Sequence, residues 1–226
     1  MDSKQRKTIP PHPTRLPRGE QELKDEYARL LATWPGLVSG PAAPLVGDSL
    51  VLLGHLADAH SVVDVGSGGG MPGIPLKIAR PDLRVVLVEA DRRRAAFLVH
   101  AAAELAIDVE VVAERAEAAA RGPLRETFDA AVCRALAPMP VLAELCLPFV
   151  RVGGRLLAMK TRVEEAAAAI AALGGGPVQV VPAPSDAREE GVVVVVPKVA
   201  PTPAAYPRRP GVPARRPLAG GPSRDA

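Results

Sequence analysis

Short valine-rich runs alternate with helical patterns along most of this 226-residue chain. The runs predicted as strands are 62–65, 85–89, 109–113, 128–134 and 155–160, followed by an antiparallel pair at 178–181 and 192–196. Helices are expected between them, at 91–106, after 113, at 139–150 and at 164–173. Strands that alternate with helices form parallel sheets that are covered on both faces. We therefore predict an α/β fold with a doubly wound, mostly parallel sheet of the Rossmann-like type.

A short helical preface stands before this sheet. Residues 20–33 have the apolar spacing of an amphipathic helix, which Trp34-Pro35-Gly36 ends, and a second helix is expected from Asp48 as its N-cap. The chain then divides into a basic, proline-rich arm at 1–19, the preface at 20–60, an α/β domain at 61–198 and a basic, proline-rich tail at 199–226.

The composition is that of a globular protein with an aliphatic core, because 48% of the residues are hydrophobic but 3% are aromatic. No apolar run approaches the roughly 18 residues of a membrane span. The N-terminal residues lack a signal-peptide pattern, so we expect a cytoplasmic protein without a membrane partner. Cys133 and Cys146 form neither a disulfide framework nor a metal-ligand motif. We expect both to be buried packing residues, and we expect no metal.

Positive charge and proline gather at the two ends of the chain, where 1–20 and 197–226 hold 12 of the 25 prolines. One explanation is a pair of low-complexity, solubilising termini. The other is contact with the phosphates of a nucleic acid, for which the tail offers Arg208, Arg209, Arg215 and Arg216. Because proline disfavours helix and favours an extended course, we expect this segment to bury little apolar area.

A glycine-rich turn, Asp64-Val65-Gly66-Ser67-Gly68-Gly69-Gly70, follows the first predicted strand. Ligands of open α/β sheets bind at the carboxyl ends of the strands, and glycine lets the backbone approach them closely. The spacing Gly68-x-Gly70-x-x-Gly73 also matches a dinucleotide fingerprint. Two features argue against a dinucleotide. Asp64 stands where it would repel a pyrophosphate. A hydride-transfer enzyme usually has a Tyr-Lys or His acid–base pair in this fold, but Tyr27 and Tyr206, the two tyrosines, lie outside the predicted α/β body. A carboxylate at this place suits a cationic ligand.

A second acid, Glu89, ends the next predicted strand, 25 residues after Asp64. From that position an acid accepts both hydrogen bonds of a ribose diol. An acid, a glycine loop and a second acid together indicate S-adenosylmethionine as the cofactor. The expected contacts are Asp64, Gly66, Gly68, Gly70 and Glu89. The simpler alternatives are a plain tight turn for the loop and a solvated strand end for Glu89.

The loop continues as Met71-Pro72-Gly73-Ile74-Pro75. From Asp64 to Pro75, it resembles the cofactor loop of the bacterial small-subunit ribosomal RNA guanine-N7 methyltransferases, the glucose-inhibited division protein B family. Similar to the same family are Arg115-Ala116-Glu117, Cys133-Arg134-Ala135-x-Ala137, Ala158-Met159-Lys160 and the tail from Tyr206 to Leu218. The resemblance extends over roughly residues 22–218 and is strongest from 62 to 160.

This resemblance implies a class I methyltransferase fold for 61–198, S-adenosylmethionine as the cofactor and guanine N7 of small-subunit (16S) ribosomal RNA as the methyl acceptor. Carried over residue by residue, the cofactor contacts are Gly66, Met71, Glu89, Ala90, Asp91, Ala116, Glu117 and Arg134. Glu89 would hold the ribose, and Ala116 and Glu117 would meet the adenine. Apart from the resemblance, Glu117 has the pattern of an exposed acid on an alanine-rich helix.

The implied chemistry needs no general base, because guanine N7 carries a lone pair and no proton; positioning is what the enzyme supplies. We assign no catalytic residue, but we expect Arg134 near the reaction centre. Arg134 would contact the cofactor carboxylate or guanine O6, or would form an ion pair with a neighbouring acid. Lys160, at the end of the fifth predicted strand, is a further candidate for a phosphate contact.

Two positions depart from the family pattern. The family's usual Arg-His is missing before Asp48-Ser49-Leu50, and Thr161 stands where the family generally has glycine. Three alternatives stay open: a methyltransferase acting on another RNA or on a small molecule, an NAD-dependent oxidoreductase, and a ribosome-binding protein without catalysis. We expect a monomeric methyltransferase whose partner is the ribosomal RNA of the small subunit.

Overall fold

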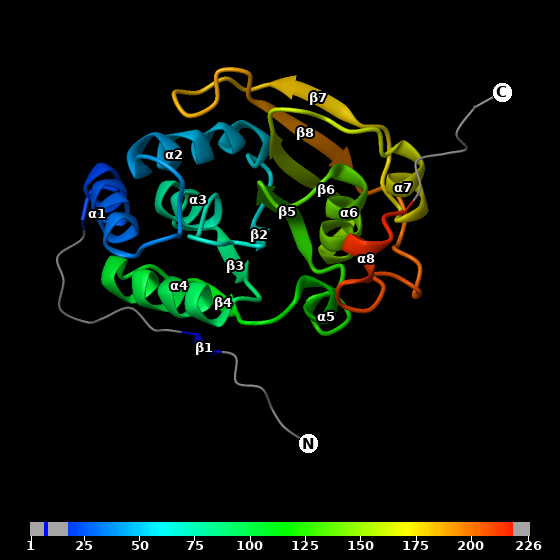
Figure 1. The fold of residues 1–226 in the computed structure, drawn as a ribbon, viewed down its shortest axis with the longest axis horizontal. Coiled ribbons are helices and arrows are strands. Elements are labelled where there is room, and N and C mark those ends of the chain that lie inside the picture. The colour runs from blue at the N-terminus through cyan, green and yellow to red at the C-terminus, as the bar shows by residue number, and fades with distance from the viewer. Residues whose placement is uncertain (1–6, 9–17, 219–226) are drawn as a thin grey trace.

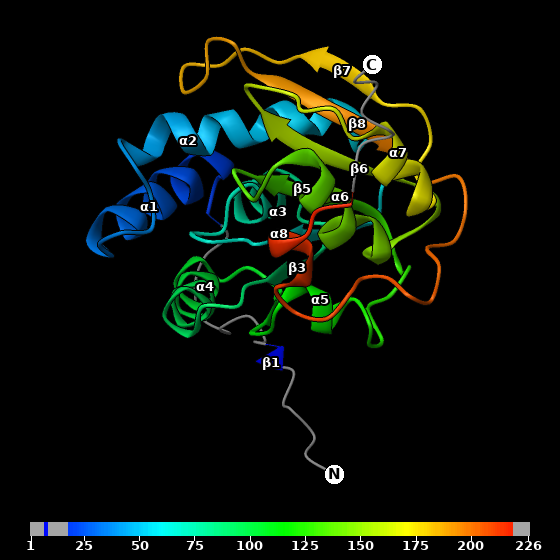
Figure 2. The same ribbon diagram turned by 45° about the vertical axis from the view of Figure 1, so that its right-hand side comes forward.

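One sheet of eight strands runs through the molecule, with helices on both of its faces (Figures 1 and 2). The computed structural model describes residues 7–8 and 18–218. Along the sheet the strands follow the order β1-β4-β3-β2-β5-β6-β8-β7. Their bounds are β1 Lys7–Thr8, β2 Ser61–Val65, β3 Arg84–Val88, β4 Glu110–Val112, β5 Phe128–Arg134, β6 Val150–Lys160, β7 Gln179–Pro182 and β8 Val192–Pro197.

The strands from β4 to β6 are parallel, whereas β1, β7 and β8 pair antiparallel with their neighbours. From β2 the chain passes to β3 and β4 on one side and then returns to β5 on the other. Open α/β sheets bind their ligands at such a reversal of strand order. The predicted doubly wound, mostly parallel fold is therefore confirmed, and the region to search for a site lies between β2 and β5.

The helices divide between the two faces of the sheet. Their bounds are α1 Glu20–Thr33, α2 Ala42–Ser49, α3 Gly73–Ala79, α4 Arg92–Leu105, α5 Ala116–Ala119, α6 Met139–Cys146, α7 Ala167–Ala172 and α8 Val212–Arg215. Buried residues of α1 to α4 form one core and those of α5 to α7 form another. Successive valines of β2 serve opposite cores, Val62 the first and Val63 the second. Burial on both faces explains why these strands are continuous apolar runs.

The helical preface packs onto the α/β domain. Trp34, which follows α1, makes an edge contact with Phe97 of α4, with ring centroids 5.5 Å apart. The prediction that Tyr27 lies outside the α/β body is wrong, because its side chain is fully buried in the first core. Its hydroxyl donates a hydrogen bond to the carbonyl oxygen of Gly69. The first helix thus supports the glycine loop directly.

Asp48 does not begin a helix, contrary to the prediction. Helix α2 starts at Ala42 and contains Asp48 in its last turn, before a 3-10 helix at Leu50–His55. The buried carboxylate of Asp48 instead accepts a hydrogen bond from Nε of Arg188, in the loop between β7 and β8, at 2.9 Å. A residue type that favours N-caps serves here in an ion pair between segments 140 residues apart, which a local pattern does not reveal.

Two predicted bounds also differ from the structure. Strand β6 begins at Val150 rather than 155 and runs through Gly153 and Gly154, with an irregular register against β5. Helix α6 ends at Cys146, and the chain continues as a 3-10 helix at Leu147–Phe149. Pro148 removes a backbone donor there, so the longer predicted α-helix cannot continue with its normal hydrogen bonds.

The C-terminal tail is folded, so the prediction of an extended segment that buries little apolar area is wrong. Pro207 and Pro213 are buried, and Tyr206 and Leu218 pack against the second core. Pro213 stands in the first turn of α8, where proline is tolerated because its missing N–H needs no partner. Figures 1 and 2 both show α8 beside α6. Most of the predicted N-terminal arm, and residues 219–226 of the tail, lie outside the described residues.

Candidate functional site

The glycine loop lies at the carboxyl end of β2, next to the end of β3. The N–H groups of Gly66 and Ser67 donate to the carbonyl oxygen of Val88, at 2.8 and 3.1 Å. Gly66 has a φ of 70°, and a Cβ there would lie 2.4 Å from Cδ1 of Leu136. Gly70 has a φ of 92°, and a Cβ would lie 2.5 Å from Cδ1 of Ile74. Both positions therefore require glycine, for backbone conformation and for space.

Gly70→Ala is expected to lower the free energy of unfolding by about 2–4 kcal/mol, through a strained backbone and a clash in a packed core. Gly68→Ala is the matched control, because its φ is also positive, at 57°, but its nearest neighbour would lie 3.9 Å away. We expect this control to cost about 1–2 kcal/mol. Urea unfolding of both variants measures the difference, and equal losses would show that the clash with Ile74 is relieved without cost.

Asp64, in β2, is fully buried beside this loop. Its Oδ2 accepts a hydrogen bond from the N–H of Gly73 at 2.9 Å, but its Oδ1 has no partner among the residues that the structure describes. Burial raises the pKa of the carboxyl from 3.8 to about 7, against the lowering effects of the Gly73 N–H and the charge of Arg134. The negative charge of Asp64 is thus only partly compensated, and a cationic group of a ligand would supply the rest.

Glu89 follows β3 and holds the loop from the other side. Its Oε2 accepts a hydrogen bond from the N–H of Gly68 and its Oε1 from the N–H of Asp91, each at 2.8 Å. Asp91 in turn caps α4, because its side chain accepts from the N–H of Arg94 at 2.9 Å. Each oxygen of Glu89 keeps a second lone pair, so the same carboxylate can also accept hydrogen bonds from a diol.

A cavity of about 300 Å³ opens at this edge of the sheet. Its walls include five of the predicted cofactor residues: Gly66, Glu89, Ala90, Ala116 and Glu117. The volume is that of a small-ligand pocket. These residues fit S-adenosylmethionine, since the cavity combines an open glycine backbone with an acid for the ribose. The carboxylate of Asp64, whose Oδ1 has no partner among the described residues, lies next to the same loop and suits a cationic ligand.

Glu117 is 2% exposed, so the pattern of an exposed acid on α5 misled. Its Oε1 accepts a hydrogen bond from the N–H of Gly211 at 2.8 Å and lies 3.4 Å from a guanidinium nitrogen of Arg115. Ala214 of α8 also lines the cavity. The tail therefore reaches the predicted adenine end of the site, and no local feature of the sequence around 116 or 211 signals this contact.

Arg134 ends β5 and is mostly buried. One of its terminal nitrogens lies 3.8 Å from Oδ2 of Asp48 and the other 3.8 Å from the sulfur of Met71. Burial lowers its pKa, while the charges of Asp48, Tyr27 and Asp64 act in the opposite direction. The ion pair considered for Arg134 exists, with Asp48 as the acid. Arg134 also lies beside Met71, at the end of the glycine loop. Its role at the reaction centre stays a prediction.

Arg188 is a residue of this region that sequence reasoning missed. Its Nη1 donates to the carbonyl oxygen of Lys160 at 2.7 Å, and its Nε is bound by Asp48. Its Nη2 is buried without a hydrogen-bond partner in the described part of the chain. A buried guanidinium nitrogen without an acceptor is costly. The only signal in the sequence is a basic residue in a turn between two predicted strands.

A second cavity, of about 330 Å³, lies at the ends of β5 and β6. Its basic lining comes from Arg134, Lys160, Arg162 and Arg188. Residues 135–137 line both this cavity and the one beside the glycine loop, so the two spaces share one wall. Within that wall, Ala135 has a φ of 50°, an unfavourable backbone conformation of a kind that clusters at functional sites.

The remaining residues predicted to bind RNA differ in exposure and in whether their charges already have partners within the protein. Nζ of Lys160 donates to Glu164 at 2.7 Å and to the carbonyl oxygen of Ala137 at 3.2 Å. Arg209, Arg215 and Arg216 are exposed. The guanidinium of Arg208 is instead bound by the buried carboxylate of Glu144, at 2.6 Å from Nη2 to Oε2. Arg208 therefore has a structural partner, which the prediction of a phosphate contact did not consider.

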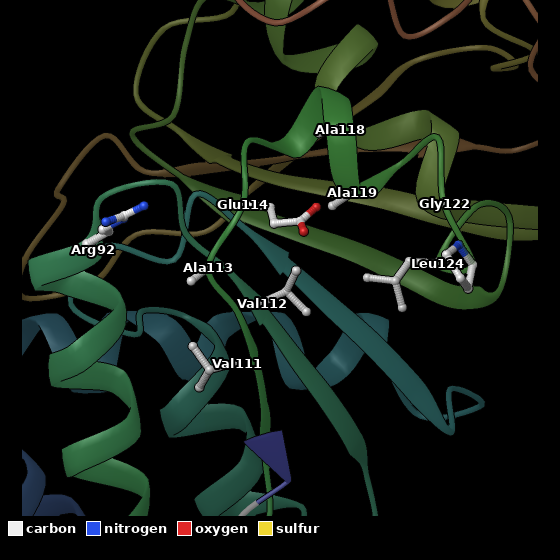
Figure 3. A pocket seen from close by; sticks show the side chains of 10 residues that line it. Arg92, Val111, Val112, Ala113, Glu114, Ala118, Ala119, Gly122 and Leu124 are labelled. Atoms are coloured by element: carbon white, nitrogen blue, oxygen red, sulfur yellow. The ribbon is translucent and has the colours of Figure 1, made fainter. Parts of the chain in front are cut away.

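A further cavity, of about 520 Å³, lies between β4 and the segment around α5 (Figure 3). Arg92 and Glu114 lie on its lining, together with alkyl side chains of β4 and of the segment around α5.

Within the described residues, no group of three or more His, Cys, Asp or Glu side chains could hold a metal ion. Cys133 and Cys146 are free and buried, as expected. None of the described helices has both the length and the hydropathy to cross a membrane.

Comparison with known proteins gives consistent relatives. The model of the family described as rRNA small subunit methyltransferase G matches residues 43–179. A protein of Roseiflexus sp. (strain RS-1) named ribosomal RNA small subunit methyltransferase G is 50% identical over 165 residues, which cover 70% of each chain. The protein of the same name from Rubrobacter xylanophilus is 42% identical, over 90% of this chain and 86% of its own length. That from Staphylococcus aureus is 36% identical, over 92% and 94%.

Solved structures support the fold at lower identity. The S-adenosylmethionine-dependent methyltransferase SibL superimposes with a TM-score of 0.57 at 16% identity, over 79% of this chain and 70% of its own. An O-methyltransferase from Bacillus cereus gives a TM-score of 0.52 at 19% identity, over 81% and 93%. At these identities the likeness concerns the fold alone, and it agrees with the sheet described above. The family model and the sequence relatives carry the assignment: the chain belongs to the rRNA small subunit methyltransferase G family.

Proposed function

We propose that this protein transfers the methyl group of S-adenosylmethionine to N7 of a guanine in small-subunit (16S) ribosomal RNA. The observation that carries this proposal is the pair of cavities that share residues 135–137 as a wall. One cavity has the acid and the glycine backbone that suit the cofactor, and the other has a basic lining that suits a nucleotide. Family membership favours a methyltransferase over the NAD-dependent oxidoreductase that the glycine spacing left open.

On the cofactor side, each residue has a distinct task. Glu89 would accept the hydrogen bonds of the ribose diol while it holds the N–H groups of Gly68 and Asp91. Glu117 and Ala116 would meet the adenine, and Gly66 would bring its backbone along the methionine portion. The buried carboxylate of Asp64 would face the positive charge of the ligand. When bound, S-adenosylmethionine supplies an electrophilic methyl group on a sulfonium centre.

On the acceptor side, Arg134 and Arg188 would position the base. The edge of guanine that carries O6 and N7 presents acceptors only, and arginine is the side chain that most often donates to it. A donor on O6 leaves the N7 lone pair free to attack, with no proton to remove. The protein therefore has to orient the base and exclude water, and no acid–base pair is needed. Lys160 and Arg162, on the lining of the same cavity, would meet the flanking phosphates.

The test is the position of the methyl group. Small ribosomal subunits from cells that lack the protein are incubated with the enzyme and S-adenosylmethionine, and the RNA is cleaved chemically at N7-methylguanine. We expect one new cleavage site in 16S ribosomal RNA. S-adenosylhomocysteine should bind the enzyme and raise its melting temperature, whereas NAD should not. Methylation of an exocyclic amine, or of another RNA in preference to 16S, would overturn the proposal. Light scattering tests the expected monomer.

Glu89→Ala is expected to weaken the binding of S-adenosylhomocysteine by about 1–3 kcal/mol, the scale of charge-assisted hydrogen bonds to a hydroxyl pair. The substitution also leaves the N–H groups of Gly68 and Asp91 without their acceptor, so a modest loss of stability should accompany it. Isothermal titration calorimetry measures the affinity. Glu190→Ala, at an exposed position of the β7–β8 loop, is the control. An unchanged dissociation constant would mean that Glu89 holds the loop and touches no ligand.

A further inference from the structure

We infer that the C-terminal segment 199–218 is a positioning element of the cofactor site. In this arrangement, Arg208 anchors the segment on Glu144, and the anchored segment holds Glu117 and closes one side of the cavity. The inference rests on the proposed function, because the ligand of the cavity is taken to be S-adenosylmethionine. Four sets of contacts, all between described residues, carry it.

The anchor is an ion pair between the buried Glu144 of α6 and the partly exposed Arg208 of the tail. Glu144 is 0% exposed and accepts three hydrogen bonds from the side chain of Arg208, at 2.6 to 3.1 Å. It also accepts the backbone N–H of Arg208 at 2.8 Å. The pKa of Arg208 is raised, first by its hydrogen bonds to Glu144. Because a buried carboxylate without its partner is costly, this pair fixes the position of residue 208 strongly.

Two arginines of the α5–β5 connection fasten the segment upstream of the anchor. Arg121 donates to the carbonyl oxygens of Pro207 and Ala205, at 2.7 and 3.1 Å. Arg125 donates to the carbonyl oxygens of Tyr206 and Thr202, at 2.8 and 2.6 Å. A proline-rich chain has few N–H groups and many free carbonyl oxygens, and the guanidinium groups satisfy these oxygens. The tail is thus bound to the connection that directly follows α5, the helix that carries Glu117.

A lysine fastens the beginning of the segment. Lys198 is 1% exposed, and its Nζ donates to Glu126 at 3.1 Å and to the carbonyl oxygen of Leu147 at 2.9 Å. Its Nζ also bonds the hydroxyl of Thr202, and Glu126 accepts the N–H of Thr202 at 2.6 Å. Burial lowers the pKa of Lys198, and its pairing with Glu126 opposes this effect. The tail therefore leaves the sheet along one defined path.

Beyond the anchor, the segment reaches the site itself. Three residues after Arg208, the N–H of Gly211 donates to Oε1 of Glu117 at 2.8 Å. Three residues further, Ala214 lines the cavity of about 300 Å³. Gly211 has a φ of 78°, so the chain turns into α8 immediately after this hydrogen bond. The tail thus sets the orientation of a carboxylate expected at the adenine and supplies part of the wall.

Arg208→Ala is expected to raise the dissociation constant of S-adenosylhomocysteine about tenfold or more, measured by calorimetry without RNA, since Glu117 loses its orientation. Arg208→Lys should recover part of the affinity, because a lysine keeps the charge but not the bidentate geometry. Arg155→Ala is the control, since it removes an arginine in the middle of β6 that pairs with Asp58 at 2.6 Å and does not line the cofactor cavity. This control should bind S-adenosylhomocysteine like the parent.

A second variant keeps the test decisive if Arg208→Ala does not fold. Ala214→Leu places a larger side chain at an exposed position on the wall of the cavity, without disturbing the anchor. We expect a raised KM for S-adenosylmethionine and an unchanged KM for RNA. Ala204→Leu, at an exposed alanine of the same tail outside the cavity, is its control and should change neither constant. The melting temperature of each variant reports its folding.

The outcomes separate the two proposals. If the parent protein does not bind S-adenosylhomocysteine, the proposed function fails, whatever the tail does. If the parent binds it and Ala214→Leu leaves the KM for S-adenosylmethionine unchanged, the tail is not part of the cofactor site and the inference is overturned. The inference is also overturned if a folded Arg208→Ala variant binds S-adenosylhomocysteine as tightly as the parent.

Discussion

Asp64→Asn is expected to make the free protein more stable above pH 7 and, at the same time, to weaken the binding of S-adenosylhomocysteine about tenfold or more. The buried carboxyl of Asp64 has its pKa raised from 3.8 to about 7. An acid with a raised pKa in the folded state favours folding in its protonated form. Its contribution is therefore largest at low pH and is lost as the pH rises from about 4 to 7.

Above pH 7 the parent protein carries the full cost of a buried charge, up to about 4 kcal/mol for a rise of this size. An asparagine is neutral at every pH, and its amide oxygen can still accept the N–H of Gly73. The gain is reduced because the amide NH2 group would take the place of the unpartnered Oδ1. Near pH 4, where Asp64 is protonated in the folded parent and about half protonated in the unfolded chain, most of this cost is absent and the two proteins should be similar.

Urea unfolding of parent and variant from pH 4 to 8 measures the first effect, and calorimetric titration at pH 6 and 8 measures the second. The parent should bind S-adenosylhomocysteine, whose amino group is cationic, more tightly at pH 8, as Asp64 loses its proton, and the variant should not. Asp108→Asn, at an exposed position between α4 and β4, is the control. A variant that is less stable than the parent at pH 8 would contradict the argument from burial, and unchanged affinity would remove Asp64 from the site.

The sheet could be predicted from the sequence because its signals are local. A parallel strand covered on both faces is a short run of valine, and a glycine turn marks the end of β2. The cap of α4 is local too, since Asp91 accepts the N–H of Arg94 three residues later. For the same reason, the acids at the ends of β2 and β3 are found by position alone. Parallel strands bring their carboxyl ends to one edge without any further information.

The contacts that complete the site could not be predicted, because they join distant segments. Tyr27 reaches the loop across 42 residues, Arg188 reaches Asp48 across 140 and Gly211 reaches Glu117 across 94. In each case, the local pattern gives another explanation. Asp48 has the residue type of an N-cap, and Glu117 follows the pattern of an exposed acid. The competing tertiary contact is stronger than either preference, since it satisfies a buried charge.

In the tail, the sequence alone likewise does not show which arginine has a partner within the protein. Arg208 and Arg209 are adjacent and equivalent in the sequence, and both qualify as phosphate contacts. In the structure, Arg208 turns inward to Glu144, whereas Arg209 is exposed. Substitutions of the two residues are therefore expected to have different effects. Substitution of Arg208 should act on stability and on the cofactor, and substitution of the exposed arginines should act on RNA.

Replacing Arg209, Arg215 and Arg216 with alanine together is expected to weaken RNA binding and to reduce its dependence on salt. These three side chains are exposed on a segment held in place by Arg208 and by the arginines of the α5–β5 connection. Each phosphate neutralised contributes about 0.7–0.9 to the slope of log affinity against log salt concentration. Three contacts would give a fall of about 2–3 in that slope, which is roughly a hundredfold or more in affinity over a tenfold range of salt.

The measurement is RNA binding at several salt concentrations, with S-adenosylhomocysteine affinity determined in parallel. Arg151→Ala with Arg155→Ala is the control, because both side chains lie in the first half of β6, away from the two cavities. The triple variant should keep its affinity for S-adenosylhomocysteine, since none of its three side chains lines the cofactor cavity. Equal salt slopes for parent and variant would mean that the tail touches no phosphate. RNA recognition would then fall to Arg134, Lys160 and the basic cavity between the ends of β5 and β6.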